Sequence, residues 1–341
     1  MVGRSSCNLQ KITEGPQENG SRWAERKADM ILTVTLNPAV DKTYRTGELF
    51  PGRVNRMRSV DNIPGGKGIN VSKILRQYDY EVTATGFLGG YQGKWMEAQL
   101  DRLKIRSAFV HVEEETRSSM NIVADNGYVT EILEPGPHIS EAHLKEFGAS
   151  FIRLAEESSL IILSGSAAPG ISADIYARLI RSAAAMGKKV ILDTSGELLK
   201  EGIQAAPAVV KPNRKELEYI IGRRLQDRED VKDAANVLLA SGIRMVMISL
   251  GDKGLILARE GRCLYARVPR VMAMNTVGCG DSVVASLAMS MTAGIGEEEL
   301  LQRAAAVSAA NATTLESGNV PLKLAEEMMK DIEIMEIQPE L

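Results

Sequence analysis

The fold class is decided by LIILSG at residues 160–165 and VILDTSG at residues 190–196, two apolar runs that each end in a glycine turn. Each run follows a stretch with helical periodicity, over residues 141–157 and 173–186. A third run, AVVKPN at residues 208–213, continues the alternation. Strands that alternate with helices are joined by right-handed crossovers, which predicts a parallel sheet covered by helices on both faces.

The chain before these runs predicts two further buried strands and a small second sheet. MILTVTL at residues 30–36 and VTATGFLGG at residues 82–90 fit the large sheet. Residues 41–60 alternate polar and apolar side chains, and residues 106–134 form a hairpin pattern around the turn Asp125-Asn126-Gly127. Because no helix separates the strands of these two segments, we expect them to form a small side sheet.

Residues 1–29 carry no pattern of a folded domain. They are polar, mixed in charge and free of apolar periodicity, and a strongly apolar run then opens at Met30. They also lack the apolar segment of a signal peptide. We expect a disordered leader or a tag over residues 1–29, and the folded domain over residues 30–341.

Composition restricts the class of protein. A chain of 341 residues with near-average composition fits an enzyme with a sizeable core. The net charge of -3 gives no basic footprint for nucleic acid, and no apolar stretch is long enough to span a membrane. The three cysteines form no CxxC pair, which predicts neither a disulfide framework nor a zinc site and favours a reducing cytoplasm. We therefore expect neither nucleic acid nor a membrane as a partner.

We expect the chemistry at NTVGCGDSVVASLAMSM, residues 275–291. Gly278 and Gly280 flank Cys279 and precede Asp281, in a loop that leads into an apolar helix. A helix start offers unpaired N–H groups at its positive end, and glycines let a phosphate approach them closely. Asp281 could then accept a proton from a hydroxyl that attacks the phosphoryl group. Taken alone, the same residues also fit a helix-capping carboxylate on a glycine turn.

PGGKGIN, at residues 64–70, is a second glycine turn that opens a helix, without the spacing of a Walker loop. Lys67 and Asn70 supply side-chain donors for a polar or anionic group, although a tight turn with a solvated lysine fits as well. Asp41 follows the first strand, where a carboxylate faces the crevice of an open parallel sheet. Arg117 at the start of the hairpin fits a phosphate clamp or a solvated surface arginine.

VKPNRKEL, at residues 210–217, places Asn213 and Glu216 where a strand ends and a helix begins. A carboxylate at this position can organise Mg²⁺ through water. The alternative is an ordinary helix start with an acidic first turn.

Taken in order, these segments resemble the phosphofructokinase B family of ribokinase-like carbohydrate kinases, from residue 30 to nearly the C-terminus. The matching segments are LNPAVD, PGGKGIN, TR, TEILEPGP, SGSAAPG, KPNRKEL, SLGDKG and NTVGCGDS. The resemblance implies a ribokinase-like three-layer α/β/α sandwich with a mainly parallel sheet and a small β-sheet lid over the sugar site. It is strongest to the branch of 1-phosphofructokinases and tagatose-6-phosphate kinases, which make 1,6-bisphosphates from ketohexose phosphates.

The resemblance also implies a role for each matching residue. Asp281 would be the general base, beside an anion hole of Gly278, Cys279 and Gly280. The sugar phosphate would be bound by Asp41, Gly65, Gly66, Lys67, Asn70 and Arg117. ATP would be bound by Lys211, Asn213, Glu216, Ser249, Gly251, Gly254 and Asn311. Mg²⁺ would be the second cofactor, organised by Glu216 through water, and we expect a homodimer through the lid.

Fructose 1-phosphate is the acceptor that we expect, because PGGKGIN followed by VSKIL is most similar to 1-phosphofructokinases. SSMN after Arg117, where that branch usually has INVK, and the run TEILEPGP favour tagatose-6-phosphate kinase as the alternative. A 6-phosphofructokinase or a non-catalytic sugar-phosphate-binding regulator fits less well, the regulator because Asp281 and both glycine turns are present. A dinucleotide-dependent oxidoreductase is disfavoured by NPAVD at residues 37–41, where GxGxxG would be expected.

Overall fold

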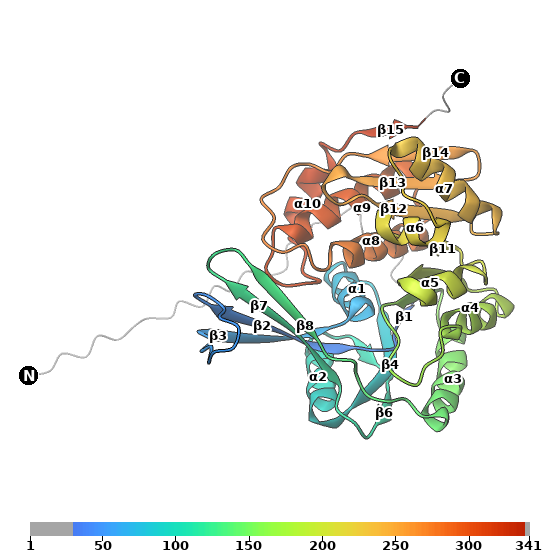
Figure 1. Cartoon of the computed structure of the whole chain (residues 1–341). Helices are drawn as coiled ribbons and strands as arrows, with labels where there is room; N and C mark the ends of the chain where they lie inside the picture. Colours follow the sequence, from blue (N-terminus) through green and yellow to red (C-terminus); the bar gives the residue numbers. More distant parts are fainter. Residues whose placement is uncertain (1–29, 338–341) are drawn as a thin grey trace, which may run out of the picture.

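The computed structural model describes residues 30–337, so the predicted leader at residues 1–29 lies outside the described residues. Within residues 30–337, the strands form an eleven-stranded sheet and a separate four-stranded sheet. Helices cover both faces of the larger sheet, and the smaller sheet projects from its side (Figure 1). This arrangement confirms the predicted α/β/α class with a small second sheet.

The larger sheet is parallel at its centre and antiparallel at one edge. The parallel strands are β1 (Ile31–Thr35), β4 (Val82–Gly89), β5 (Arg106–Ser107), β6 (Val110–Val112), β9 (Leu160–Ser164), β10 (Lys189–Asp193), β11 (Val209–Val210) and β12 (Met245–Ser249). The antiparallel edge consists of β13 (Leu255–Arg259), β14 (Arg262–Ala266) and β15 (Ile334–Glu336). The order is β15-β14-β13-β12-β11-β10-β9-β1-β4-β5, and β6 pairs with β4.

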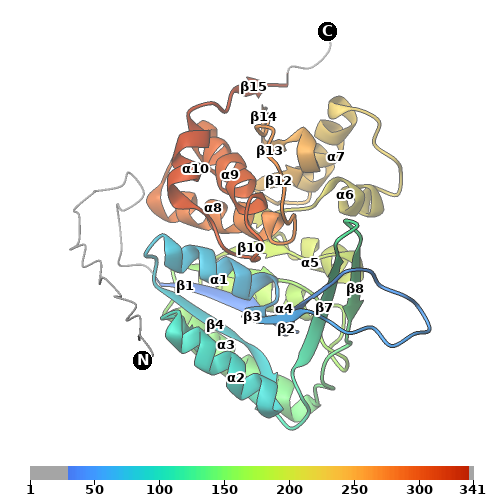
Figure 2. The ribbon, with the colours of Figure 1, turned by 90° about the vertical axis from the view of Figure 1, so that its left-hand side faces the viewer.

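Two layers of helices bury two apolar clusters, one on each face of this sheet. One layer consists of α1 (Lys67–Gln77), α2 (Gly90–Arg102), α8 (Cys279–Ala293), α9 (Glu297–Ala312) and α10 (Leu322–Met329). The other consists of α3 (Glu141–Glu156), α4 (Ile175–Ala185), α5 (Gly196–Ile203), α6 (Arg214–Ile221) and α7 (Arg228–Ala240). Figure 2 shows the first layer facing the viewer, with α1 and α8 side by side. β1 is buried along its whole length, as expected for a strand covered on both faces.

The smaller sheet has the order β3-β2-β7-β8, with β2 and β7 parallel and the outer pairs antiparallel. Its strands are β2 (Ala39–Thr46), β3 (Ser59–Gly65), β7 (Arg117–Ala124) and β8 (Val129–Leu133). The segment predicted for this sheet, residues 106–134, needs one correction. Its first part forms β5 and β6, which pair with β4 of the larger sheet, because Val110 and Val112 are buried in the main core.

The carboxyl ends of the parallel strands position the candidate site. β10 ends at Asp193 and β12 ends at Ser249, so both reach the same edge of the sheet. The chain leaves β1 at Thr35 on that edge and enters the smaller sheet at Ala39. Within residues 30–337, no helix combines the length and the apolar character that crossing a membrane requires.

Candidate active site

The start of α8 has the backbone geometry that the sequence predicted for an anion site. Gly278 has φ 88°, in the left-handed region, and a Cβ there would lie 3.1 Å from the backbone nitrogen of Gly318. No side chain of the described chain caps the helix. Within the described residues, the N–H groups of Gly280 and Asp281 have no hydrogen-bond acceptor, whereas that of Cys279 donates to the carbonyl oxygen of Thr276 at 3.4 Å. The two free N–H groups can bind an anion.

Asp281 lies in the first turn of α8, with only 4% of the residue exposed. Asn70 Nδ2, from α1, donates a hydrogen bond of 2.9 Å to Asp281 Oδ2. Burial raises the pKa of Asp281 to about 6, and the charge of Lys67 opposes this rise. The carboxylate is therefore more basic than an ordinary aspartate and still mainly ionised at neutral pH, which suits a general base.

Two lysines meet at the carboxylate of Asp193, at the end of β10. Lys211 Nζ lies 3.0 Å from Asp193 Oδ1, and Lys67 Nζ lies 3.4 Å from both carboxylate oxygens. Burial acts to raise the pKa of Asp193, but Lys211 and Lys67 outweigh it and hold the pKa below its ordinary value. Two ammonium groups and one carboxylate leave one positive charge beside Asp281.

Lys211 faces the glycine turn. A Cβ added to Gly280 would lie 3.3 Å from Lys211 Nζ, so this ammonium group is next to the free N–H groups of the turn. Lys211 is buried, whereas 40% of the Lys67 side chain is exposed. The arrangement places a fixed buried cation and an accessible cation where negative charge would collect during phosphoryl transfer.

Asp41 of the smaller sheet also belongs to this site. Its carboxylate lies directly against Gly65, where a Cβ would come within 2.1 Å of Asp41 Oδ2, so the close approach requires glycine. Burial raises the pKa of Asp41 to about 6, with Lys73 as the strongest opposing influence. Asp281 contributes to the same rise. The structure therefore brings together two carboxylates that lie 240 positions apart in the chain, counting from residue 41 to residue 281.

Arg117 does not extend freely into solvent. Its Nε donates to the carbonyl oxygen of Asn37 at 3.2 Å, and its Nη1 donates to that of Glu134 at 3.2 Å. Burial lowers the pKa of Arg117, and the charge of Asp41 opposes this effect. Arg117, at the start of β7, thus connects the loop after β1 to the residue that follows β8. Its role as a phosphate clamp stays a prediction.

Asn213 and Glu216 form a reciprocal capping box at the start of α6. Asn213 N donates to Glu216 Oε2 at 2.8 Å, and Glu216 N donates to Asn213 Oδ1 at 2.9 Å. A short parallel bridge connects Asn213 to Ser249 at the end of β12. Glu216 Oε1 has no partner within the described chain and could accept a hydrogen bond from metal-bound water.

The remaining predicted nucleotide residues line the turns around this edge. Gly251 opens a short 3₁₀ turn after β12. Gly254 has φ 108°, and a Cβ there would lie 2.1 Å from the carbonyl oxygen of Ala266. Asn311 Nδ2, from α9, donates to the carbonyl oxygen of Val277 at 3.3 Å. Asn311 therefore supports the loop that leads into α8, and its contact with the nucleotide stays a prediction.

The described residues offer little direct ligation for a metal ion. Within residues 30–337, no three His, Cys, Asp or Glu side chains are grouped closely enough to hold one. Asp193 is already paired with two lysines, and Glu216 is engaged in its capping box. This donor set suits Mg²⁺, which keeps several waters and is bound largely through substrate phosphates.

Sequence reasoning missed two residues of this site, Asp193 and Lys73. Asp193 ends the apolar run VILD, so its signal was a carboxylate at the carboxyl end of a buried strand. Lys73 is buried on α1, where its Nζ donates to the carbonyl oxygen of Ser317 and lies 3.6 Å from Glu316 Oε1. No pattern in the sequence distinguishes this lysine from a solvated one.

The site therefore combines a buried carboxylate, two lysines and a glycine turn. Comparisons with known proteins give the family of the chain. The model of the pfkB family of carbohydrate kinases matches residues 32–323. A tagatose-6-phosphate kinase of Staphylococcus epidermidis is 34% identical over 311 residues, which cover 90% of this chain and 100% of that protein.

Two solved structures are also similar. Phosphofructokinase-2 from Escherichia coli in complex with fructose-6-phosphate has a TM-score of 0.81 and 26% identity, over 89% of this chain and 99% of that chain. A protein of Thermotoga maritima described as a possible 1-phosphofructokinase has a TM-score of 0.83 and 28% identity, over 91% of this chain and 100% of that chain.

Proposed function

Since the chain belongs to the pfkB family of carbohydrate kinases and is an ATP-dependent sugar-phosphate kinase, we propose that it phosphorylates the free primary hydroxyl of a ketohexose monophosphate to give the 1,6-bisphosphate. The observation that carries this proposal is the buried carboxylate of Asp281, which lies beside two free backbone N–H groups and near the Lys67 and Lys211 ammonium groups. A base and an anion site in contact are what phosphoryl transfer to an alcohol requires.

In this mechanism Asp281 accepts the proton of the attacking hydroxyl. The hydroxyl oxygen forms a bond to the γ-phosphorus of ATP as the bond from that phosphorus to the bridging oxygen breaks, and ADP leaves with the electron pair. The N–H groups of Gly280 and Asp281, with Lys211, stabilise the negative charge of the transferring group. Mg²⁺ would neutralise the ATP phosphates, and Glu216 Oε1 is the group that could accept from its water.

Two acceptors differ in the end of the sugar that carries the existing phosphate. Fructose 1-phosphate, which the sequence favours, would present its 6-hydroxyl to Asp281. Tagatose 6-phosphate would present its 1-hydroxyl. The relatives named tagatose-6-phosphate kinase match this chain at 34% identity along their whole length. This similarity makes tagatose 6-phosphate the first candidate acceptor. The Thermotoga maritima structure supports fructose 1-phosphate as the second candidate.

The experiment measures kcat/KM with ATP and Mg²⁺ for tagatose 6-phosphate, fructose 1-phosphate and fructose 6-phosphate in parallel. We expect tagatose 6-phosphate to lead by at least tenfold, about 1.4 kcal/mol of transition-state discrimination. Asp281→Asn provides the background rate, because it removes the base and keeps the shape. A tenfold lead for fructose 1-phosphate would reverse the order of the acceptors, and no turnover with any of the three would remove the proposed reaction.

The exposed strand of the smaller sheet supports the predicted homodimer. All five residues of β8 are exposed, among them Val129 at 60%, Ile132 at 45% and Leu133 at 60%. An exposed apolar edge strand is a surface that a second copy can cover. Light scattering after gel filtration should give a dimer mass for the wild-type protein and a monomer mass for Val129→Asp with Leu133→Asp. A monomeric wild-type protein would exclude the dimer.

A further inference from the structure

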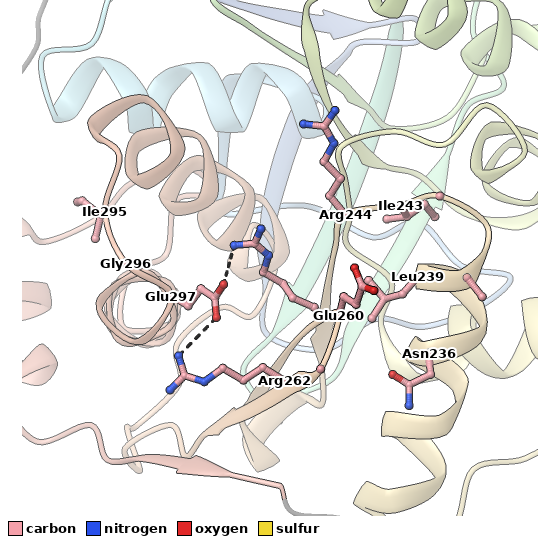
Figure 3. A pocket seen from close by; sticks show the side chains of 13 residues that line it. Asn236, Leu239, Ile243, Arg244, Glu260, Arg262, Ile295, Gly296 and Glu297 are labelled. Carbon is pink, nitrogen blue, oxygen red and sulfur yellow. Dashed lines mark hydrogen bonds and ion pairs between the residues drawn. The ribbon is translucent and has the colours of Figure 1, made fainter.

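A cavity of about 1100 Å³ lies where β12 begins, on the edge of the sheet opposite the candidate active site (Figure 3). Its wall comes from the end of α7, the turn between β13 and β14 and the connection between α8 and α9. Arg244 precedes β12 and Ser249 ends it. At about 3.3 Å per residue, the strand separates the two edges by on the order of 15 Å. The cavity is therefore distinct from the site at Asp281.

Charged side chains of both signs form part of the wall of this cavity. The ionisable residues that line it are Arg244, Arg259, Arg262, Glu260 and Glu297. Glu297 Oε1 lies 2.6 Å from Arg259 Nη1, and Glu297 Oε2 lies 3.5 Å from Arg262 Nη1 (Figure 3). Arg262 also pairs with Glu298 at 2.6 Å and with Glu336 at 3.9 Å, so carboxylates neutralise both Arg259 and Arg262.

Arg244 is the cation that these contacts leave unused. It makes no hydrogen bond or ion pair within residues 30–337, and Figure 3 shows its side chain extending away from Glu297. Arg244 also lines a second cavity of about 260 Å³, which shares Arg259 and Glu297 with the first. Lys189 lines this second cavity and is likewise unpaired within the described chain. Arg244 therefore lines both cavities, whereas Lys189 lines the second one alone.

Apolar side chains complete both walls, including Leu239, Ile243 and Met291.

We propose that the two adjoining cavities bind one phosphorylated small molecule, with Arg244 and Lys189 at its phosphate and the apolar walls against its organic part. Arginine and lysine are the side chains with which proteins bind phosphate. The apolar walls suit the organic part, and the volume suits a molecule as large as a sugar phosphate or a nucleotide. This ligand site is independent of the acceptor and of the phosphoryl transfer at Asp281.

The test is calorimetric titration of the full-length protein with metal-free inorganic pyrophosphate. Pyrophosphate can also bind at the active site, so Lys67→Met serves to identify that contribution; this variant keeps the buried pair of Lys211 and Asp193. We expect one binding event to survive Lys67→Met and to weaken at least tenfold in the double variant Arg244→Ala with Lys189→Ala. Arg181→Ala is the control for the loss of a surface cation, because Arg181 on α4 is exposed and makes no hydrogen bond or ion pair within residues 30–337.

The double variant should keep kcat/KM within twofold of wild type, because Lys189 and Arg244 lie at the amino ends of β10 and β12, the edge of the sheet opposite Asp281. An unchanged kcat/KM shows that the variant is folded. The proposal is wrong if the wild-type protein binds no pyrophosphate or if the double variant binds it with unchanged affinity. It is also wrong if Arg181→Ala weakens binding as much as the double variant does. Loss of the same event in Lys67→Met would assign all the binding to the active site.

Discussion

Asn70 and Asp281 are joined by a hydrogen bond of 2.9 Å, from the amide Nδ2 to the carboxylate Oδ2, although 211 positions separate them in the chain. The bond connects the first turn of α1 to the first turn of α8. It fixes the orientation of the carboxylate, and Asp281 Oδ1 makes no hydrogen bond within the described residues. Oδ1 is therefore the oxygen that can accept the proton of a substrate hydroxyl.

Asp281→Asn should lower kcat by roughly a hundredfold or more, the scale of losing a general base. The amide keeps the shape of the carboxylate but cannot take a proton, so ATP and the sugar phosphate should bind nearly as before. Steady-state kinetics and calorimetric binding of both substrates measure the two effects separately. Near-normal turnover in a correctly folded variant would remove Asp281 from the mechanism.

The pH dependence of kcat/KM should show an acid limb near pH 6. Burial raises the pKa of Asp281 to about 6. A general base works only when deprotonated, so the rate should rise with pH through this pKa and level off above it. Asp41, whose pKa is also raised to about 6, interacts with Asp281, so the limb reports the pair. A rate that stays constant from pH 7 down to pH 5 would contradict the raised pKa.

Gly280→Val should damage phosphoryl transfer more than sugar binding. The added Cβ would lie 3.3 Å from Lys211 Nζ, and the two methyl groups beyond it would enter the space in front of the free N–H groups. We expect kcat to fall at least tenfold, while the affinity for the sugar phosphate changes less. Gly280→Ala is the graded control with a smaller loss. If Gly280→Val abolished the affinity for the sugar phosphate and left kcat unchanged, the turn would bind the sugar phosphate and not the transferring phosphoryl group.

The layered fold was predictable because its signals are local and repeated. The apolar runs at residues 160–165 and 190–196 each follow a helical pattern. In the structure they form β9 and β10, which follow α3 and α4 in the chain. The boundary of the smaller sheet was not predictable in the same way. Residues 106–112 have a short β pattern that fits either sheet, and only the burial of Val110 and Val112 decides between them.

The glycine turns of the candidate site were predictable because each marks a helix start, with Gly278 before α8 and Gly66 before α1. The pairing of Asp193 with two lysines was not, because Lys67 lies 126 positions before Asp193 and their contact depends on how β10 and α1 meet. Sequence patterns predict which face of a helix or strand is buried and where the element ends. They do not predict which side chains, distant in the sequence, form an ion pair with the same carboxylate.

Lys73 should prove to be a positioning residue of the site. Its ammonium group donates to the carbonyl oxygen of Ser317. The next residue, Gly318, lies against α1, since a Cβ added to it would be 3.0 Å from Asn70 Cα. Lys73→Met should therefore loosen the contact between α1 and the start of α8, and it also removes the strongest charge that lowers the pKa of Asp41. We expect kcat/KM to fall at least tenfold and its acid limb to move to higher pH.

Glu316→Gln and Lys73→Arg are the controls for this prediction. Glu316 is 46% exposed, so its substitution weakens the ion pair with Lys73 from the solvent side and should have a smaller effect. Lys73→Arg keeps the charge and should keep the acid limb in place. An unchanged acid limb in Lys73→Met would show that the lysine supports stability alone.

Arg117→Ala should raise KM for the sugar phosphate at least tenfold and lower kcat less. The guanidinium holds the carbonyl oxygens of Asn37 and Glu134, and it lies close enough to Asp41 to influence its charge. If Arg117 binds the existing phosphate of the substrate, its loss removes binding energy that the ground state and the transition state share, which appears in KM.

Arg117→Lys is the informative partner: it keeps a charge for the phosphate but cannot hold two carbonyl groups with a planar fork. A phosphate clamp predicts partial recovery of KM in Arg117→Lys, whereas a purely structural arginine predicts that both variants lose stability and kcat together. Thermal unfolding measured beside the kinetics separates these outcomes, and a KM within twofold of wild type in Arg117→Ala would exclude the clamp.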